Sequence, residues 1–162
     1  MLTFNEKQKF TQWWLWFILI AVGVSPLIGI YTQLIQKKPF GDSPLTDTGL
    51  IIYTITIFAI IILFLALTLR IKITIKGIQM NYFPFVKKEI LWTEIKTAEV
   101  VNYGFVGGWG MRWGTAYGTV YNTKGNKGLA IALHNGKTFV IGTQKEEEMK
   151  TIVEKAKALS LL

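Results

Sequence analysis

The sequence predicts a membrane-anchored α+β protein, in which two transmembrane helices precede a bent antiparallel β-barrel of about seven strands capped by one C-terminal helix. Three observations predict this class. Residues 13–31 and 49–69 form apolar runs without a charged residue, and each has about the 20 residues that a helix needs to cross a bilayer. Short segments of alternating apolar and polar residues, typical of strands, fill most of the chain after residue 70. An amphipathic helical pattern then ends the chain.

The two apolar runs divide the chain into three parts. Thr46, Asp47 and Thr48 are residue types that cap helix N-termini, and they stand just before the second run. Pro39, Gly41 and Pro44 interrupt any helix between the runs. We assign a cytoplasmic N-terminal segment to residues 1–12, a transmembrane hairpin to 13–69 with its loop at 32–48, and a small β domain to 70–162 with its helix at 144–159.

Lysine and arginine residues beside the runs predict the orientation of the hairpin. Five flank its two outer ends and two lie in the loop, and the excess marks the cytoplasmic side. We therefore expect a multi-pass protein of the inner (cytoplasmic) membrane, with both termini and the β domain in the cytoplasm. Trp13, Trp14 and Trp16 are candidate anchors at the membrane interface, where amphipathic rings are enriched. The flanking cations are Lys7, Lys9, Arg70, Lys72 and Lys76, and those in the loop are Lys37 and Lys38.

A signal peptide is the alternative interpretation of the first run. Lys7 and Lys9 would then form its basic region, and Ala21-Val22-Gly23 its cleavage site. The three tryptophans near the start of the run, and its continuation to Tyr31, favour a retained span.

Composition excludes several classes of site. The chain has no cysteine, which excludes a disulfide scaffold, a thiolate metal site and a thiol nucleophile. Its formal net charge is +8, and 14 of the 18 Lys and Arg residues lie from Arg70 onward, against 7 of the 10 acids. Such a charge suits an anionic membrane surface, nucleic acid or an acidic protein patch, and it also serves simply to set topology.

The region after residue 70 shows regular strand and turn signals. Ile71 to Lys76 alternates without a fault, and Gly77 then offers a tight turn. Asn135-Gly136 is the strongest hairpin signal, because a type I′ turn needs positive φ at both central residues. Thr143 and Glu146 match a capping box. The apolar stripe of the helix that follows is Met149, Ile152, Val153 and Ala156.

These segments resemble a known family. "LWTEI" at 91–95, "GGWGMRWG" at 107–114, "NGK" at 135–137 and "IGTQ" at 141–144, followed by a helix, are similar to bacterial pleckstrin-homology-like (PH-like) domains. Such domains commonly follow transmembrane helices in proteins of unassigned function. The resemblance covers about residues 71–160 and implies a seven-stranded bent barrel capped by a helix. It implies no phosphoinositide site, because the first hairpin here is only the short Lys76-Gly77 turn.

No catalytic constellation stands out in the sequence. His134 is the only histidine, and its place beside the Asn135-Gly136 turn indicates an exposed turn residue. Asp42 and Asp47 lie between the apolar runs, and no carboxylates are spaced as acid–base partners or as a metal cage. We therefore expect no enzyme, no metal, no cofactor and no small-molecule substrate.

Two surfaces are candidates for binding. Lys72, Lys76, Lys87 and Lys88 are candidates for a basic face that contacts lipid headgroups, or for an ordinary solvated strand face. In the glycine-rich segment 107–114, Trp109, Arg112 and Trp113 are candidates for a partner surface, with core packing of the two rings as the alternative.

The leading functional hypothesis is a non-catalytic, membrane-tethered interaction module that binds a protein partner or a second copy of itself. The first alternative is a sensor of anionic lipid headgroups. The second is an accessory subunit of a larger membrane complex. The partners expected are the lipid bilayer and a protein. The cations are dispersed and few aromatic residues are interleaved with them, which disfavours nucleic acid as a ligand.

Overall fold

The computed structural model describes residues 3–160 and divides them into two compact units. One unit joins the N-terminal stretch up to Phe10 with the chain from Leu67 onward, and the other comprises Thr11–Ala66. Each unit is described separately below.

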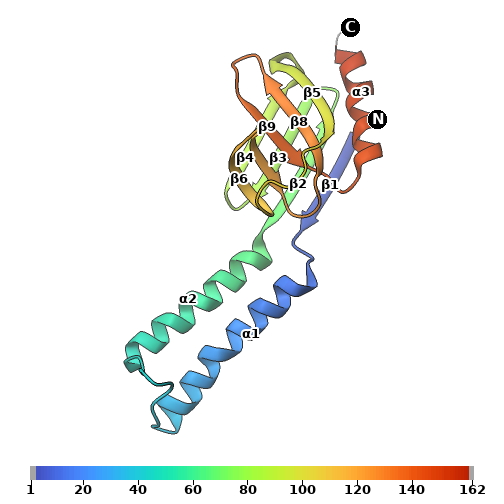
Figure 1. Cartoon of the computed structure of the whole chain (residues 1–162). Helices are drawn as coiled ribbons and strands as arrows, with labels where there is room; N and C mark the ends of the chain where they lie inside the picture. The colour runs from blue at the N-terminus through green and yellow to red at the C-terminus, as the bar shows by residue number, and fades with distance from the viewer. Residues whose placement is uncertain (1–2, 161–162) are drawn as a thin grey trace. The chain divides into compact units, whose positions relative to one another are not determined.

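The Thr11–Ala66 unit is a helical hairpin (Figure 1). Helix α1, Trp13–Gly29, continues directly into the π-helical turns of η1, Ile30–Ile35, and α2 covers Asp47–Ala66. Both helical segments are long and apolar enough to cross a membrane. In the most apolar stretch of each, only 17% of the residues are buried for Trp13–Ile35 and 11% for Asp47–Ala66. Trp13 and Trp14 are exposed and Trp16 is half-buried. The apolar side chains of this hairpin therefore face outward rather than into a core of their own.

The hairpin differs from the expected spans at three ends, one of which is the start of the second helix at Asp47 instead of residue 49. Its first helical segment runs on to Ile35, and its second ends at Ala66 instead of residue 69, because Thr68 already begins a strand. The predicted capping of the second helix is confirmed at Thr46. Its carbonyl accepts the Leu50 N–H at 2.9 Å, and its Oγ1 accepts the Gly49 N–H at 3.1 Å.

The other unit contains nine strands in two sheets, among the residues that the structure describes. The four-stranded sheet has the order β1-β2-β3-β4, and the five-stranded sheet has the order β5-β8-β9-β7-β6. Neither sheet closes on itself. The strands are β1 Thr3–Lys9, β2 Thr68–Thr74, β3 Gly77–Phe83, β4 Val86–Leu91, β5 Ile95–Asn102, β6 Gly110–Thr115, β7 Gly118–Asn122, β8 Lys127–Leu133 and β9 Thr138–Gly142.

The expected all-antiparallel arrangement of about seven strands needs correction. The β8–β9 hairpin lies between β5 and β7, so β9 runs parallel to β7, with Thr119 opposite Phe139. The hairpin turn lies at Asn135-Gly136 as predicted, but it is not the expected type I′ turn, because Asn135 does not have a positive φ. Gly136 has a φ of +83°, and the Leu133 N–H donates to the Lys137 carbonyl at 2.9 Å.

The N-terminal strand β1 is the largest difference from the expected domain boundaries. Residues 1–12 were expected to form a separate segment, but Thr3–Lys9 pairs antiparallel with β2 along its whole length, from Thr3 opposite Thr74 to Lys9 opposite Thr68. Three residues join β1 to α1, and Leu67 alone joins α2 to β2. Both ends of the helical hairpin therefore continue into adjacent, paired strands.

Helix α3, Glu146–Ser160, contacts β1 and β2 from one sheet and β5 and β8 from the other (Figure 1). The predicted apolar stripe is confirmed, since Met149, Val153 and Ala156 are buried. Lys157 Nζ donates to the Ala98 carbonyl on the edge strand β5. The helix thus fills the opening between the β1 and β5 edges, which otherwise present unpaired backbone groups.

The predicted capping box at the start of this helix does not form. The helix begins after Lys145, whose carbonyl accepts the Met149 N–H at 2.9 Å. Thr143 Oγ1 instead accepts the Lys145 N–H at 3.0 Å and donates to the carboxylate of Glu6 at 2.6 Å.

Candidate functional site

The outer face of the four-stranded sheet carries a continuous polar surface. Strand residues alternate between the two faces, and Ile71, Ile73, Ile78, Met80 and Tyr82 are buried on the inner side. The residues between them face outward and line up across the strands by register. One cross-strand row is Lys7, Arg70, Asn81 and Lys87, and the next is Asn5, Lys72, Gln79 and Glu89.

We call this surface, defined by those eight residues, the basic face. It holds four cations, Lys7, Arg70, Lys72 and Lys87, against the single acid Glu89. Gln79 Nε2 donates to Glu89 Oε1 at 2.9 Å. Within residues 3–160, the ion pairs Lys127–Glu146 and Lys145–Glu148 lie elsewhere and involve none of the four cations. Among the eight residues of the basic face, Glu89 is thus the one acid that offsets the positive charge.

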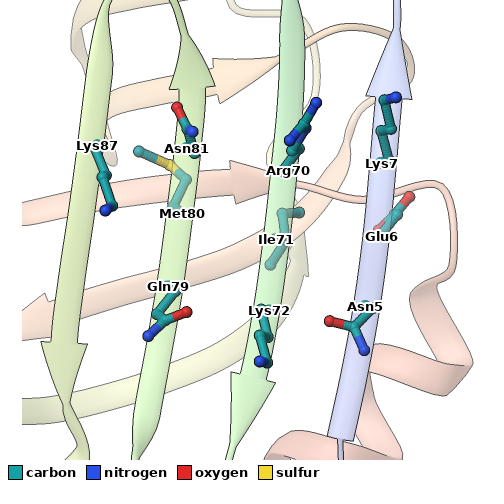
Figure 2. Close-up of a pocket in the computed structure, with 10 residues that line it drawn as sticks. All are labelled: Asn5, Glu6, Lys7, Arg70, Ile71, Lys72, Gln79, Met80, Asn81 and Lys87. Carbon is teal, nitrogen blue, oxygen red and sulfur yellow. The ribbon is translucent and has the colours of Figure 1, made fainter.

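Lys7 and Arg70 stand directly opposite each other on β1 and β2. Like charges in such a cross-strand position destabilise a sheet by roughly 0.2–1 kcal/mol. Figure 2 shows Lys7, Arg70 and Asn81 at one level of the sheet and Asn5, Lys72 and Gln79 at the next. The arrangement is unfavourable for an isolated sheet and becomes favourable when an anion lies over it.

An open hollow of about 450 Å³ lies over this surface. Its volume is in the range of small-molecule pockets, although it is shallow and exposed to solvent. The hollow extends across β1, β2, β3 and β4, and the residues of its rim and floor are Asn5, Glu6, Lys7, Arg70, Ile71, Lys72, Gln79, Met80, Asn81 and Lys87.

The predicted headgroup residues divide between this face and other places. Lys72 and Lys87 belong to the basic face, and Lys76 is exposed in the β2–β3 turn beside a smaller hollow that also contacts Lys72. Lys88 lies on the opposite side of β4, with Nζ 4.4 Å from the ring centroid of Phe139 and 5.4 Å from that of Tyr121. Burial, and then the nearby Lys137, lower the pKa of Lys88.

The sequence did not group Lys7 and Arg70 with the candidate headgroup residues. Both had been counted only as topology signals, because their alignment depends on the pairing of β1 with β2 across the helical hairpin. The local sequence offers only Phe4 and Phe10 on one face as a signal for this strand, because every residue between them is polar.

Buried polar side chains hold β1 in this register. Glu6 accepts hydrogen bonds from Thr143 Oγ1 at 2.6 Å and from the Gln144 N–H at 2.8 Å. Gln8 Nε2 donates to the Gly142 carbonyl at 2.8 Å, and Gln8 Oε1 accepts from Thr123 Oγ1 at 3.0 Å. These bonds satisfy polar groups that would be costly to bury unpaired.

The three candidate residues of the glycine-rich segment 107–114 differ from one another in exposure. The Trp113 side chain is 71% exposed, whereas Trp109 and Arg112 are half-buried. Arg112 Nη2 donates to the Trp109 carbonyl at 2.9 Å. Tyr82 is buried nearby, and burial raises its pKa to about 12 despite the opposing charge of Arg112. Trp113 therefore belongs to the surface rather than the core, as does Phe105, which is 91% exposed.

His134 is exposed at the β8–β9 turn, where its backbone N–H donates to the Glu94 carbonyl at 3.0 Å. Across the described range 3–160, no three His, Asp or Glu residues are grouped so that they could hold a metal ion.

Comparison with known proteins adds no assignment to this geometry. No family model, no curated protein and no solved structure matches the chain. The functional inference therefore depends on the charge, register and connections of the basic face.

Proposed function

We propose that this protein is a two-span membrane protein with a PH-like β domain on the cytoplasmic side, and that the domain is a non-catalytic module that binds anionic lipid headgroups with its basic face. The observation that carries the proposal is the row of Lys7, Arg70 and Lys87, in which two cations are directly opposed and no acid intervenes.

The connections to the helices support a position beside the lipid. Arg70 follows the end of α2 at Ala66 by four residues, and an extended chain of that length reaches at most about 14 Å. The headgroup layer occupies roughly 5–7 Å beyond the hydrocarbon on each side, and the Debye length is about 8 Å at physiological ionic strength. If α2 spans the membrane, Arg70 therefore lies within electrostatic range of the headgroups.

The charge of the face is sufficient to matter at that range. A lysine or arginine near an anionic leaflet contributes about 1 kcal/mol, so the four cations together contribute on the order of 4 kcal/mol at low salt. The pairing of β1 with β2 also supports the hairpin topology, because residues 3–9 and 68–74 belong to one sheet and so lie on the same side of the membrane. A cleaved signal peptide is disfavoured for the same reason, since its basic region would be a strand of the mature domain.

Native mass spectrometry of the full-length protein in detergent tests the proposal. Phosphatidylglycerol and phosphatidylcholine are titrated separately, and the apparent Kd of each first-bound lipid is measured. We expect at least about tenfold tighter binding of the anionic lipid by the wild type. A variant with Lys7→Gln, Arg70→Gln, Lys72→Gln and Lys87→Gln is expected to lose this preference.

The matched control removes the same number of charges from other surfaces of the β domain. Lys96, Lys124, Lys150 and Lys155 are exposed on β5, the β7–β8 turn and α3, and all four are changed to Gln. We expect the control to keep the preference for the anionic lipid. Equal losses in the two variants would show that total charge, and not the basic face, controls binding, and would rule out the proposal.

Binding of a protein partner or a second copy is the second candidate, and the exposed rings of Phe105 and Trp113 favour it. Large aromatic side chains are enriched at protein interfaces. Light scattering of the full-length protein in detergent compares the wild type with Phe105→Ser and Trp113→Ser, and a concentration-dependent oligomer that only the wild type forms would support self-association.

A further inference from the structure

The basic face combines its cations with three amide side chains, Asn5, Gln79 and Asn81. A surface of cations alone binds phosphate groups without distinguishing what is attached to them, because ammonium and guanidinium groups only donate hydrogen bonds. An amide both donates and accepts, so it suits a ligand group that does the same. A hydroxyl is such a group.

Two of these amides flank the central cation of the second row. Asn5 stands opposite Lys72 on one side, and Gln79 stands opposite it on the other. Figure 2 shows the side-chain oxygens of Asn5 and Gln79 directed toward β2 from opposite sides, whereas the Gln79 nitrogen is directed toward β4. That nitrogen donates to Glu89 at 2.9 Å, which holds the amide in this orientation.

We propose that the basic face selects headgroups in which hydroxyl groups follow the phosphate, that is, a glycerol phosphodiester lipid of the phosphatidylglycerol type. The inference rests on the proposed function, which supplies the anionic lipid, and it adds the chemistry beyond the phosphate. Lys7, Arg70 and Lys87 hold the phosphate oxygens, and Asn5 and Gln79 bind the glycerol hydroxyls beside Lys72.

The order of the two rows along the chain agrees with the direction of a lipid headgroup. Arg70 is closer than Lys72 to the end of α2, and Lys7 is closer than Asn5 to the start of α1. Along the chain, the row of Lys7, Arg70 and Lys87 (the cationic row) is therefore nearer the ends of the two apolar helices. The row of Asn5, Lys72 and Gln79 (the amide row) is two residues farther from them on β1 and β2, or about 6.6 Å of strand. In a membrane lipid the phosphate likewise lies nearer the acyl chains than the terminal glycerol does, and a glycerol unit extends over a similar length.

The second row also disfavours headgroups that end in an amine. Lys72 stands at its centre and would repel an ammonium group, and Glu89, the one acid of the basic face, is already engaged by Gln79. Phosphatidylserine is the informative comparison, because it has the same net charge as phosphatidylglycerol but carries an ammonium and a carboxylate instead of hydroxyls. Charge alone gives equal binding of the two lipids, whereas the amide row favours the glycerol headgroup.

Native mass spectrometry of the full-length protein, with phosphatidylglycerol and phosphatidylserine of identical acyl chains, measures this selectivity. We expect the wild type to bind phosphatidylglycerol about five- to tenfold more tightly. The double variant Asn5→Ala, Gln79→Ala keeps all four cations and is expected to bind the two lipids equally. Thr97→Ala with Thr119→Ala, on the other sheet, is the matched control and is expected to keep the selectivity.

The outcomes separate this inference from the proposed function. Equal binding of both lipids by the wild type, with loss of both in the Lys7, Arg70, Lys72 and Lys87 variant, would overturn the selectivity and leave headgroup binding in place. If the variant bound both lipids as tightly as the wild type, both the selectivity and the proposed headgroup binding would be overturned. A soluble competitor, glycerophosphoglycerol, is included in the titration. Displacement of the lipid by this competitor at equal concentration would show that the site recognises a free glycerophosphate, which contradicts a membrane-lipid ligand.

Discussion

The carboxylate of Glu6 accepts a 2.6 Å hydrogen bond from the hydroxyl of Thr143, a residue 137 positions later in the chain. Glu6 belongs to the strand that leads into helix α1, and Thr143 belongs to the segment that leads into helix α3. The same carboxylate accepts the Gln144 N–H at 2.8 Å. These bonds fix β1 inside the β domain, and so they place Lys7 opposite Arg70 on the outer face.

Replacing Glu6 with Gln tests this contact without changing the size of the side chain. A glutamine keeps one acceptor oxygen but turns the other position into a donor, which faces either the Thr143 hydroxyl or the Gln144 N–H. Because Glu6 is buried, we expect the variant to lose about 1–3 kcal/mol of stability. Thermal unfolding of the full-length protein in detergent measures the effect. Glu154→Gln on the exposed side of α3 is the control, and an equal melting temperature for the two variants would contradict the proposed importance of Glu6.

Gly77 is expected to be far less tolerant of alanine than Gly136. A Cβ at Gly77 would lie 2.2 Å from the Ile90 carbonyl oxygen and 3.0 Å from Leu91 Cα, so the β3–β4 pairing must open. At Gly136 a Cβ meets nothing within 4 Å, and only its φ of +83° is unfavourable. We expect a cost of about 3 kcal/mol or more for Gly77→Ala and about 1–2 kcal/mol for Gly136→Ala. Similar melting temperatures for the two variants would show that the β2–β3 turn adjusts more easily than its backbone contacts indicate.

The raised pKa of the buried Tyr82 predicts that the folded protein loses stability at alkaline pH. Burial raises its pKa from 10.0 to about 12 in the folded protein. Between these pH values the unfolded chain has released the phenolic proton and the folded protein still holds it, so stability is fully present below pH 10 and falls as the pH rises toward 12. Two pKa units correspond to about 3 kcal/mol. Burial also raises the pKa values of Tyr103 and Tyr121, which adds to the same trend.

Melting temperatures of the wild type and Tyr82→Phe between pH 9 and pH 12, roughly the interval that the pKa shift defines, measure this contribution. Phenylalanine cannot ionise, so the variant is expected to lose less stability than the wild type over the interval. Parallel curves for the two proteins would mean that Tyr82 titrates near its ordinary pKa in the folded state.

Cysteine labelling tests the topology, since the natural chain contains no cysteine. Ser43 is exposed between α1 and α2, and Lys124 is exposed in the β7–β8 turn. In intact cells, we expect a membrane-impermeant maleimide to label a Ser43→Cys variant and to leave a Lys124→Cys variant unlabelled. Permeabilised cells are the control, in which both variants react. Labelling of the Lys124 position in intact cells would place the β domain outside and remove the cytoplasmic headgroups as its ligands.

Local sequence patterns were sufficient wherever an element depends on its own neighbours. The charge-free runs predicted α1 and α2, the Asn135-Gly136 pair predicted the β8–β9 turn, and the spacing of Met149, Val153 and Ala156 predicted the buried stripe of α3. Each of these signals lies within a few turns or residues of the structure that it specifies. The helix start was displaced because Thr143, which has the right local spacing for a cap, bonds to Glu6 instead.

The strand β1 shows why elements that depend on distant residues were not predictable. Its inner face contains Phe4, Glu6 and Gln8, and Phe10 follows directly after its end. The two polar residues Glu6 and Gln8 interrupt the apolar alternation that identifies a half-buried strand. Glu6 and Gln8 are buried because Gly142, Thr143 and Gln144 satisfy their hydrogen bonds. No residue near them in sequence carries that information.

The order of residues along the chain was enough to specify apolar helices, a basic β domain and a final amphipathic helix, because hydrophobicity and helical or strand periodicity are local properties. Which cations of β1 and β2 share a surface was set by strand pairing across the helical hairpin, which brings Lys7 opposite Arg70. Lys88 faces away from Lys87 for a local reason, because successive residues of a strand point to opposite faces. Register is a long-range property, since a shift of one residue moves every side chain of a strand to the other face. The composition of the basic face, and with it the proposed ligand, follows from that register.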